Sequence, residues 1–331
     1  MPEENDRVYY HMYTSFFGLK ENPFNVTPDP KFFYLSLQHR EALNHLVYGI
    51  NEKKGFIVIT GGIGTGKTTI CRAILSMLSD SISTALIFNS YISDLDLLET
   101  IIQEFGIMIE PGEQSKKRYI DALNSFLLEN FTAGKNAVLL IDESQNLPLT
   151  TLEQIRMLSN LETEKEKLLQ IVLLGQPELD DLLHAPLLKQ LNERITVRYD
   201  IEPLDRSQVS NYVEHRLVIA GGTNNTPRFL TGAYNALYVF SKGIPRRINT
   251  ICDRALLIAY TKDNREIDAG IIEQAAHDVG GRHILSHRHG FTSPWWNALL
   301  YVFFFVIILA LLGIINSDNI AYIVSSWKGA P

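Results

Sequence analysis

Short continuous runs of apolar residues alternate along the chain with longer stretches whose apolar residues are spaced three or four positions apart. A continuous apolar run predicts a strand buried on both faces, and the wider spacing predicts a helix with one apolar side. Their alternation is typical of an α/β domain whose parallel sheet is covered by helices on both faces. The expected strands span residues 56–60, 84–88, 137–142, 168–174 and 195–201, and the expected helices between them include residues 68–79, 94–105, 116–131 and 152–161.

The pattern changes after Pro203, beyond which no further strand is predicted. Several of the following segments open with Pro or Asp at a capping position, which favours helices. We therefore expect an α/β domain over residues 36–203 and a helical domain over residues 204–280. The expected helices of the second domain span residues 205–220, 227–241, 245–261 and 268–279.

A third pattern, an apolar run without a polar face, covers residues 295–315 and is interrupted only by Asn297. About 20 apolar residues suffice to cross a bilayer as a helix, so this run predicts one transmembrane helix. Basic residues lie before it in a linker, residues 281–294, and the positive-inside bias places that side in the cytoplasm. We expect cytoplasmic N-terminal domains and a short tail, residues 316–331, outside.

The overall charge narrows the classes of partner. Lys and Arg total 30 against 37 for Asp and Glu, a formal net charge of −7. Nucleic-acid binders usually carry a basic footprint, so this balance disfavours nucleic acid as a partner. The two cysteines, Cys71 and Cys252, are far apart and lack a metal-ligand spacing, which argues against a disulfide framework and indicates a reducing compartment.

The first strand–helix turn carries a phosphate-binding motif. Residues 61–68 match G-x-x-x-x-G-K-[ST], with a strand predicted before them and a helix after them. Glycines let consecutive backbone N–H groups surround phosphates, Lys67 reaches the β and γ oxygens, and the Thr68 hydroxyl ligates Mg²⁺. A glycine-rich turn without a ligand is the alternative. The motif predicts ATP and Mg²⁺ as cofactors, with nucleotide contacts from Gly61, Gly62, Ile63, Gly64, Thr65, Gly66, Lys67, Thr68 and Thr69.

Two carboxylates follow the third predicted strand. Asp142 ends the apolar run of residues 137–142, and Glu143 comes directly after it. The acid that ends such a strand helps to hold Mg²⁺ in P-loop enzymes, so Asp142 is expected on the metal together with Thr68. Glu143 is placed to polarise the attacking water as catalytic base. Acids beyond a strand also occur as plain solvated turn residues, which is the alternative for this pair.

Several further segments give the chain a family resemblance. The Asp-Glu pair, the helical domain after the sheet and residues 243–246 resemble an AAA+ ATPase. Residues 13–24, 27–34 and 191–195 resemble the general secretion pathway protein A family, which includes ATPases linked to type II secretion and to pilus biogenesis. The resemblance covers about residues 13–280. It implies an AAA+ α/β core with a C-terminal all-helical lid, and an N-terminal family segment, residues 1–35, packing on the core.

The resemblance also implies roles for residues outside the two motifs. Gln176 falls where AAA+ proteins place a polar sensor after the fourth strand, Arg246 is the expected second sensor in the lid, and Arg194 is the expected arginine finger offered to a neighbouring subunit. The alternative for each arginine is an exposed salt bridge. Three aromatic residues near the N-terminus are expected to contact the adenine or, as the alternative, to pack in the hydrophobic core: Phe16, Phe17 and Phe24.

Taken with the predicted span, the resemblance implies an ATPase in the bacterial inner membrane, forming homo-oligomers. Its expected function couples ATP binding and hydrolysis to the assembly or positioning of a cell-envelope machine, with secretion, pilus or polysaccharide-export components as partners. Two alternatives stay open. One is a DNA-acting AAA+ ATPase similar to transposition helper ATPases, and the other is an ATP-binding scaffold with little turnover.

Overall fold

The computed structural model describes residues 12–27, 29–88, 91–110, 112, 115–164, 166–222 and 226–280. The chain divides into two compact units, Met1–Val279 and Gly280–Pro331, and all of the described residues except Gly280 lie in the first. The predicted linker, residues 281–294, the predicted transmembrane helix, residues 295–315, and the predicted tail, residues 316–331, lie outside the described residues.

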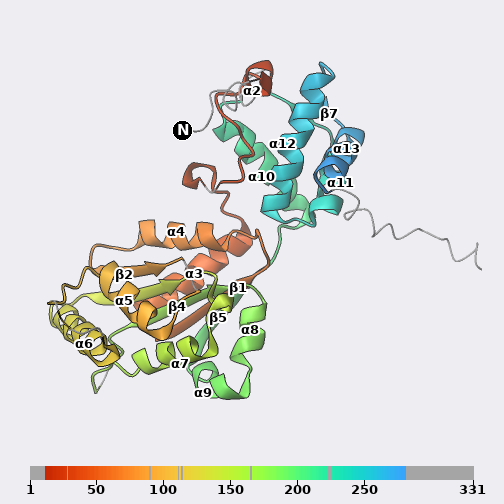
Figure 1. The fold of residues 1–331 in the computed structure, drawn as a ribbon. Helices are drawn as coiled ribbons and strands as arrows, with labels where there is room; N and C mark the ends of the chain where they lie inside the picture. The colour runs from red at the N-terminus through yellow and green to blue at the C-terminus, as the bar shows by residue number, and fades with distance from the viewer. Residues whose placement is uncertain are drawn as a thin grey trace, which may run out of the picture. The chain divides into compact units, whose positions relative to one another are not determined.

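A parallel sheet of five strands forms the centre of the α/β part, in the order β2-β3-β4-β1-β5 (Figure 1). The strand that carries the phosphate-binding motif, β1, lies between β4 and β5, with Phe56 opposite both Ile171 and Ile195. The five runs of apolar residues therefore form the predicted parallel sheet. The strands are β1 (Phe56–Gly61), β2 (Ile82–Ile87), β3 (Asn136–Ile141), β4 (Gln170–Gly175) and β5 (Ile195–Ile201).

Helices cover both faces of this sheet, because successive strand side chains point to opposite sides. Ile57 and Ile59 of β1 pack with α3 and α4, whereas Phe56 and Val58 pack with the helices of the other face. The first face carries α3 (Leu37–Asn51) and α4 (Lys67–Met77). The second carries α5 (Asp94–Glu104), α6 (Lys116–Thr132), α7 (Leu149–Leu158), α8 (Glu178–Leu183) and α9 (Lys189–Asn192), with the 3-10 turns η2 (Ser144–Asn146) and η3 (Pro186–Leu188) between them.

A second hydrophobic core joins the helical part to the N-terminal segment. Phe17, Phe24 and Phe32 are at most 3% exposed and pack into the same core as the four later helices. In Figure 1 the first helix lies beside α12. The elements are α2 (Met12–Phe16), η1 (Pro30–Phe32), α10 (Arg206–Ile219), α11 (Thr231–Ser241), α12 (Pro245–Thr261) and α13 (Ala269–Gly280).

The prediction that this part is entirely helical is wrong in one detail. Two short parallel strands, β6 (Arg228–Phe229) and β7 (Glu266–Ile267), pair within it. The Arg228 N–H donates to the Arg265 carbonyl at 2.9 Å, and the Leu230 N–H donates to the Ile267 carbonyl at 2.9 Å. Because these N–H groups are engaged by a distant segment, the helix predicted from residue 227 begins only at Thr231.

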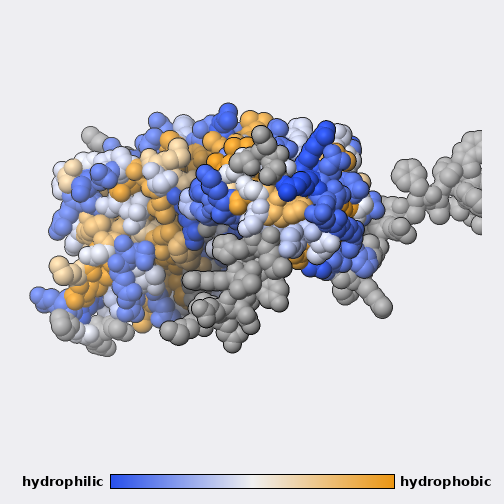
Figure 2. Space-filling model, turned by 90° about the horizontal axis from the view of Figure 1, so that it is seen from above, coloured by the Kyte–Doolittle hydropathy of each residue, from blue (hydrophilic) through white to orange (hydrophobic). Residues whose placement is uncertain are grey.

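Among the described residues, no helix is both long enough and apolar enough to span a membrane. Helix α5 is an example of an amphipathic helix among them, with Leu97, Leu98, Ile101 and Ile102 on its buried side. On the face seen in Figure 2, hydrophilic residues are spread between patches of hydrophobic ones.

Candidate nucleotide-binding site

The phosphate-binding turn connects the end of β1 to the start of α4. Gly64 and Gly66 have φ angles of +80° and +106°, a left-handed conformation that side chains rarely adopt. Neighbouring groups also leave no room for a side chain at either position. A Cβ on Gly64 would lie 2.6 Å from Cβ of Arg246, and a Cβ on Gly66 would lie 2.7 Å from Nε2 of His39. The turn is therefore tightly packed against two side chains from other parts of the fold.

Lys67 is the first residue of α4, and its side chain lies against the first residues of this turn. Its Nζ donates to the carbonyl oxygens of Gly61 at 2.7 Å and Gly62 at 3.1 Å, and the residue is only 5% exposed. Burial lowers the pKa of Lys67, an effect that the nearby carboxylates Glu143 and Asp142 oppose. A cation is thus held where the turn and the helix N-terminus gather N–H groups, which suits a phosphate ligand.

The predicted metal ligands meet directly. The Thr68 hydroxyl donates to Oδ2 of Asp142 at 2.7 Å, which joins the start of α4 to the end of β3. Burial raises the pKa of Asp142, and its hydrogen bond from Thr68 lowers it. A hydroxyl and one carboxylate are hard oxygen ligands that suit Mg²⁺, which keeps several waters and takes further ligands from phosphates. Among the described residues, no cluster of three or more His, Cys, Asp or Glu side chains could hold a metal ion.

Glu143 is held by two glutamine amides. It has a left-handed backbone with φ 52°, which is costly for a residue other than glycine and is typical of functional sites. Its Oε2 accepts from the side chains of Gln145 at 2.6 Å and Gln176 at 3.1 Å. Burial raises the pKa of Glu143, but these two hydrogen bonds and the charge of Lys67 together outweigh it and the net shift is downward. The carboxylate is therefore ionised near neutral pH, as a base must be.

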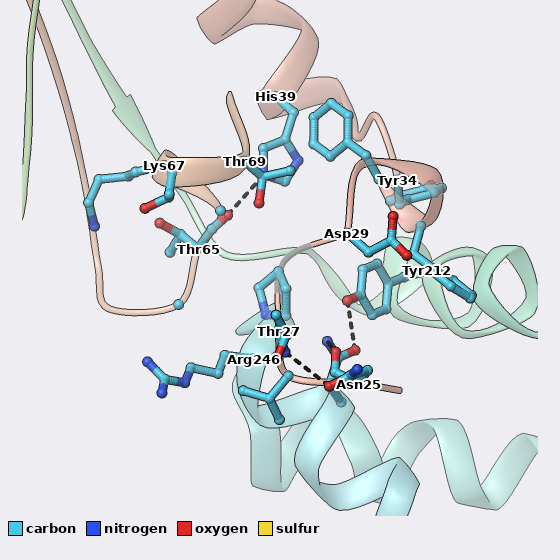
Figure 3. Close-up of a pocket in the computed structure, with 18 of the residues that line it drawn as sticks. Asn25, Thr27, Asp29, Tyr34, His39, Thr65, Lys67, Thr69, Tyr212 and Arg246 are labelled. Carbon is cyan, nitrogen blue, oxygen red and sulfur yellow. Dashed lines mark hydrogen bonds between the residues drawn. The ribbon is translucent and has the colours of Figure 1, made fainter. Parts of the chain in front are cut away.

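A cavity of about 290 Å³ opens beside the turn, lined by the N-terminal segment, the turn and the helical part (Figure 3). Gly61, Gly62 and Asp142 lie next to the lining residues rather than among them. The predicted site residues that line the cavity are Ile63, Gly64, Thr65, Gly66, Lys67, Thr68, Thr69, Glu143, Gln176 and Arg246.

Arg246 brings the helical part against the phosphate-binding turn. Its backbone N–H donates to the carbonyl of Gly64 at 3.3 Å, and its side chain extends on the side of the turn in Figure 3. Arg246 is the second residue of α12, directly after Pro245. This hydrogen bond therefore links the start of α12 directly to the phosphate-binding turn.

Arg194 lies at the opposite end of the parallel strands, where the strands begin. It directly precedes Ile195, which pairs with the first residue of β1, whereas the phosphate-binding turn follows the last. The six residues of β1, at about 3.3 Å each, separate the two ends of the strand by about 20 Å. The Arg194 guanidinium donates to the Arg156 carbonyl at 3.2 Å and to the Ser159 hydroxyl, both at the end of α7. It cannot reach the phosphate position of its own chain.

The sequence did not reveal a buried polar network at the wall of the cavity. Arg216, which is 7% exposed, donates to the Pro23 carbonyl and, at 3.1 Å, to the Tyr212 hydroxyl. The Tyr212 hydroxyl in turn donates to Asn249 at 2.7 Å. No motif marks these residues, because they come from α10, α12 and the N-terminal segment and meet only in the fold.

The expected aromatic contact with adenine has no support in this geometry. Phe16, Phe17 and Phe24 do not line the cavity, and they pack in the core of the helical part instead. The aromatic side chains that do line it are Phe32, Phe33, Tyr34 and Tyr212. Gln145, which holds both Glu143 and the Gln176 N–H, was also missed, since an isolated glutamine in a turn gives no pattern.

Comparisons with known proteins agree with the fold and the motif. Residues 50–183 match the model of an AAA domain. General secretion pathway protein A of Aeromonas hydrophila is 46% identical over 270 residues, which are 82% of this chain and 49% of that relative. The chain therefore spans about half the length of this curated relative.

Solved structures are similar in fold at low identity. Cdc6p from Pyrobaculum aerophilum has a TM-score of 0.60 at 16% identity, covering 76% of this chain and 71% of its own. A chain of Drosophila ORC bound to DNA has a TM-score of 0.55 at 20% identity, covering 84% of this chain and 68% of its own. At these identities the likeness concerns the fold alone.

Proposed function

We propose that this chain, which belongs to the general secretion pathway protein A family of AAA+ proteins, is a membrane-anchored ATPase. It couples ATP binding and hydrolysis to the assembly or positioning of a cell-envelope machine of the secretion, pilus or polysaccharide-export type. The observation that carries the ATPase assignment is the 2.7 Å hydrogen bond between Thr68 and Asp142, which brings the two motifs together at the phosphate-binding turn.

Each residue of the site has a part in the proposed reaction. The backbone N–H groups of the turn and Lys67 bind the phosphates, and Thr68 and Asp142 hold Mg²⁺. When bound, the metal ion neutralises charge on the phosphate oxygens. Glu143 accepts the proton of the attacking water, while Gln176 keeps its carboxylate in place. Arg246 reaches the γ-phosphate from the helical part, which acts as the lid.

The proposed assembly is a homo-oligomer at the bacterial inner membrane. Arg194 is about 20 Å from the phosphate position of its own chain. In the proposed assembly it acts as an arginine finger on the nucleotide bound by a neighbouring subunit. Residues 295–315 form the membrane anchor, with the ATPase domain in the cytoplasm and the tail outside. Other components of the envelope machine are the partners, for which the secretion protein A relative is the support.

Nucleotide binding tests the site itself. Lys67→Ala is expected to weaken ATP binding by about 10- to 100-fold, since it removes a charge-assisted contact of about 1.5–3 kcal/mol. Equilibrium binding of a fluorescent ATP analogue to the full chain measures this. Lys189→Ala is the matched control, because that lysine has a 78% exposed side chain and should leave binding unchanged. Equal binding by wild type and Lys67→Ala would contradict the assignment of the site.

Membrane anchoring makes a separate prediction. The full chain should sediment with the membrane fraction and resist extraction by salt, because an apolar helix, unlike a charge contact, is not released by screening. Truncation after Gly290 should move it to the supernatant with ATP binding intact. Recovery of the full chain in the supernatant would contradict the proposed anchor.

A further inference from the structure

A buried histidine contacts the phosphate-binding turn from outside the motif. His39 is the third residue of α3 and is 5% exposed. Its Nε2 lies 2.9 Å from the carbonyl oxygen of Thr65, and its Nδ1 lies 2.7 Å from the hydroxyl of Ser36. Figure 3 shows the ring directed at Thr65. The imidazole is therefore held at both nitrogens.

The hydrogen bonds define its protonation. A carbonyl oxygen only accepts, so Nε2 carries the proton and donates to Thr65. Nδ1 is then free to accept from the Ser36 hydroxyl in the neutral ring. Burial lowers the pKa of His39, partly offset by its bond to Thr65, and so favours this neutral form. Ser36 also accepts from the His39 backbone N–H at 3.2 Å as the cap of α3, which ties the ring to the start of the helix.

The contact has a consequence for the turn itself. In a planar trans peptide the C=O and the N–H point in opposite directions. A Thr65 carbonyl directed at His39 therefore sends the N–H of Gly66 to the other side of that peptide. In this conformation position 66 also has no room for a side chain, because a Cβ there would lie 2.7 Å from Nε2 of His39.

We propose that His39 is a positioning residue of the nucleotide site. It fixes the peptide between Thr65 and Gly66 so that the Gly66 N–H faces the phosphates of the bound nucleotide. The inference rests on the proposed ATP binding and adds a residue outside the phosphate-binding motif to the site. It also joins α3, which begins directly after the N-terminal segment, to the phosphate-binding turn.

Four variants of the full chain test this role. His39→Leu removes both hydrogen bonds and should weaken ATP binding by about tenfold, the loss expected when a buried carbonyl loses its donor. His39→Gln can place its amide N–H near the position of Nε2 and should restore most of the affinity. His39→Asn has a shorter side chain, cannot reach Thr65 and should bind as weakly as His39→Leu. His45→Leu is the matched control on the same helix, since that ring is exposed and lies 5.1 Å from the ring of Tyr199.

Equilibrium binding of the fluorescent ATP analogue and thermal unfolding without nucleotide are measured on each variant. The inference predicts that affinity follows the order wild type, Gln, then Asn and Leu, whatever the order of unfolding temperatures. Equal affinities of His39→Gln and His39→Asn, which differ by one methylene, would overturn it even if His39→Leu did not fold. Failure of wild type and His45→Leu to bind ATP would overturn the proposed function as well, and so is distinct from a failure confined to His39.

Discussion

Glu143→Gln is expected to bind ATP as tightly as wild type and to lose about 10²- to 10⁴-fold in turnover, the usual contribution of a general base. The substitution keeps the size of the side chain. It leaves untouched the contacts of Lys67 with the turn and of Thr68 with Asp142. A glutamine amide, however, cannot accept the proton of the attacking water. ATP affinity and phosphate release, measured on the same preparation, separate the two effects.

The control for this variant is Glu193→Gln, which removes a carboxylate with a 66% exposed side chain and should leave both quantities unchanged. Wild-type turnover by Glu143→Gln would mean that Glu143 is not the base. Lost ATP binding would instead indicate that the left-handed turn at Glu143 depends on its carboxylate.

Arg194→Ala is expected to bind ATP normally and to lose on the order of 10³-fold in turnover, the contribution of an arginine finger in trans. An exposed salt bridge would give a far smaller effect. The side chain also contacts the end of α7, so a fall in unfolding temperature accompanies the substitution. Arg198→Ala is the matched control, because that arginine of β5 forms an ion pair at the surface, 2.8 Å from Asp180 of α8.

Mixing subunits distinguishes a finger from a structural contact. Arg194→Ala keeps an intact nucleotide site, and Lys67→Ala keeps an intact Arg194. A mixture of the two should hydrolyse ATP faster than either alone, provided that cross-linking shows mixed oligomers. Mixed oligomers without any gain would leave Arg194 as a support of α7 and no more.

The sequence predicted the parts of the fold that are set by local pattern. The five strands and the phosphate-binding turn follow from runs such as residues 56–60, because a continuous apolar run can be buried only in a covered sheet. Strand ends were less well predicted. The fourth strand begins at Gln170 rather than Leu168, since Lys167 is engaged in an antiparallel bridge with Glu162 just before it.

What the sequence did not reveal depends on contacts between distant segments. Arg228 was assigned to a helix because its pairing with Glu266 is invisible to periodicity. His39 and Gln145 escaped notice for the same reason, since each acts on a residue of the site that only the fold brings near. For Phe17 and Phe24 the sequence left both the adenine and the core as possible contacts, and only the fold shows that they pack in the core of the helical part.

Phosphate release by the full chain in excess ATP and Mg²⁺, compared with Lys67→Ala prepared in the same way, tests the ATPase assignment most directly. Wild type is expected to release phosphate, with a specific activity that rises with protein concentration as subunits assemble, and Lys67→Ala is expected to show only background release. Equal release by the two proteins, or ATP binding by wild type without any release above background, would contradict it.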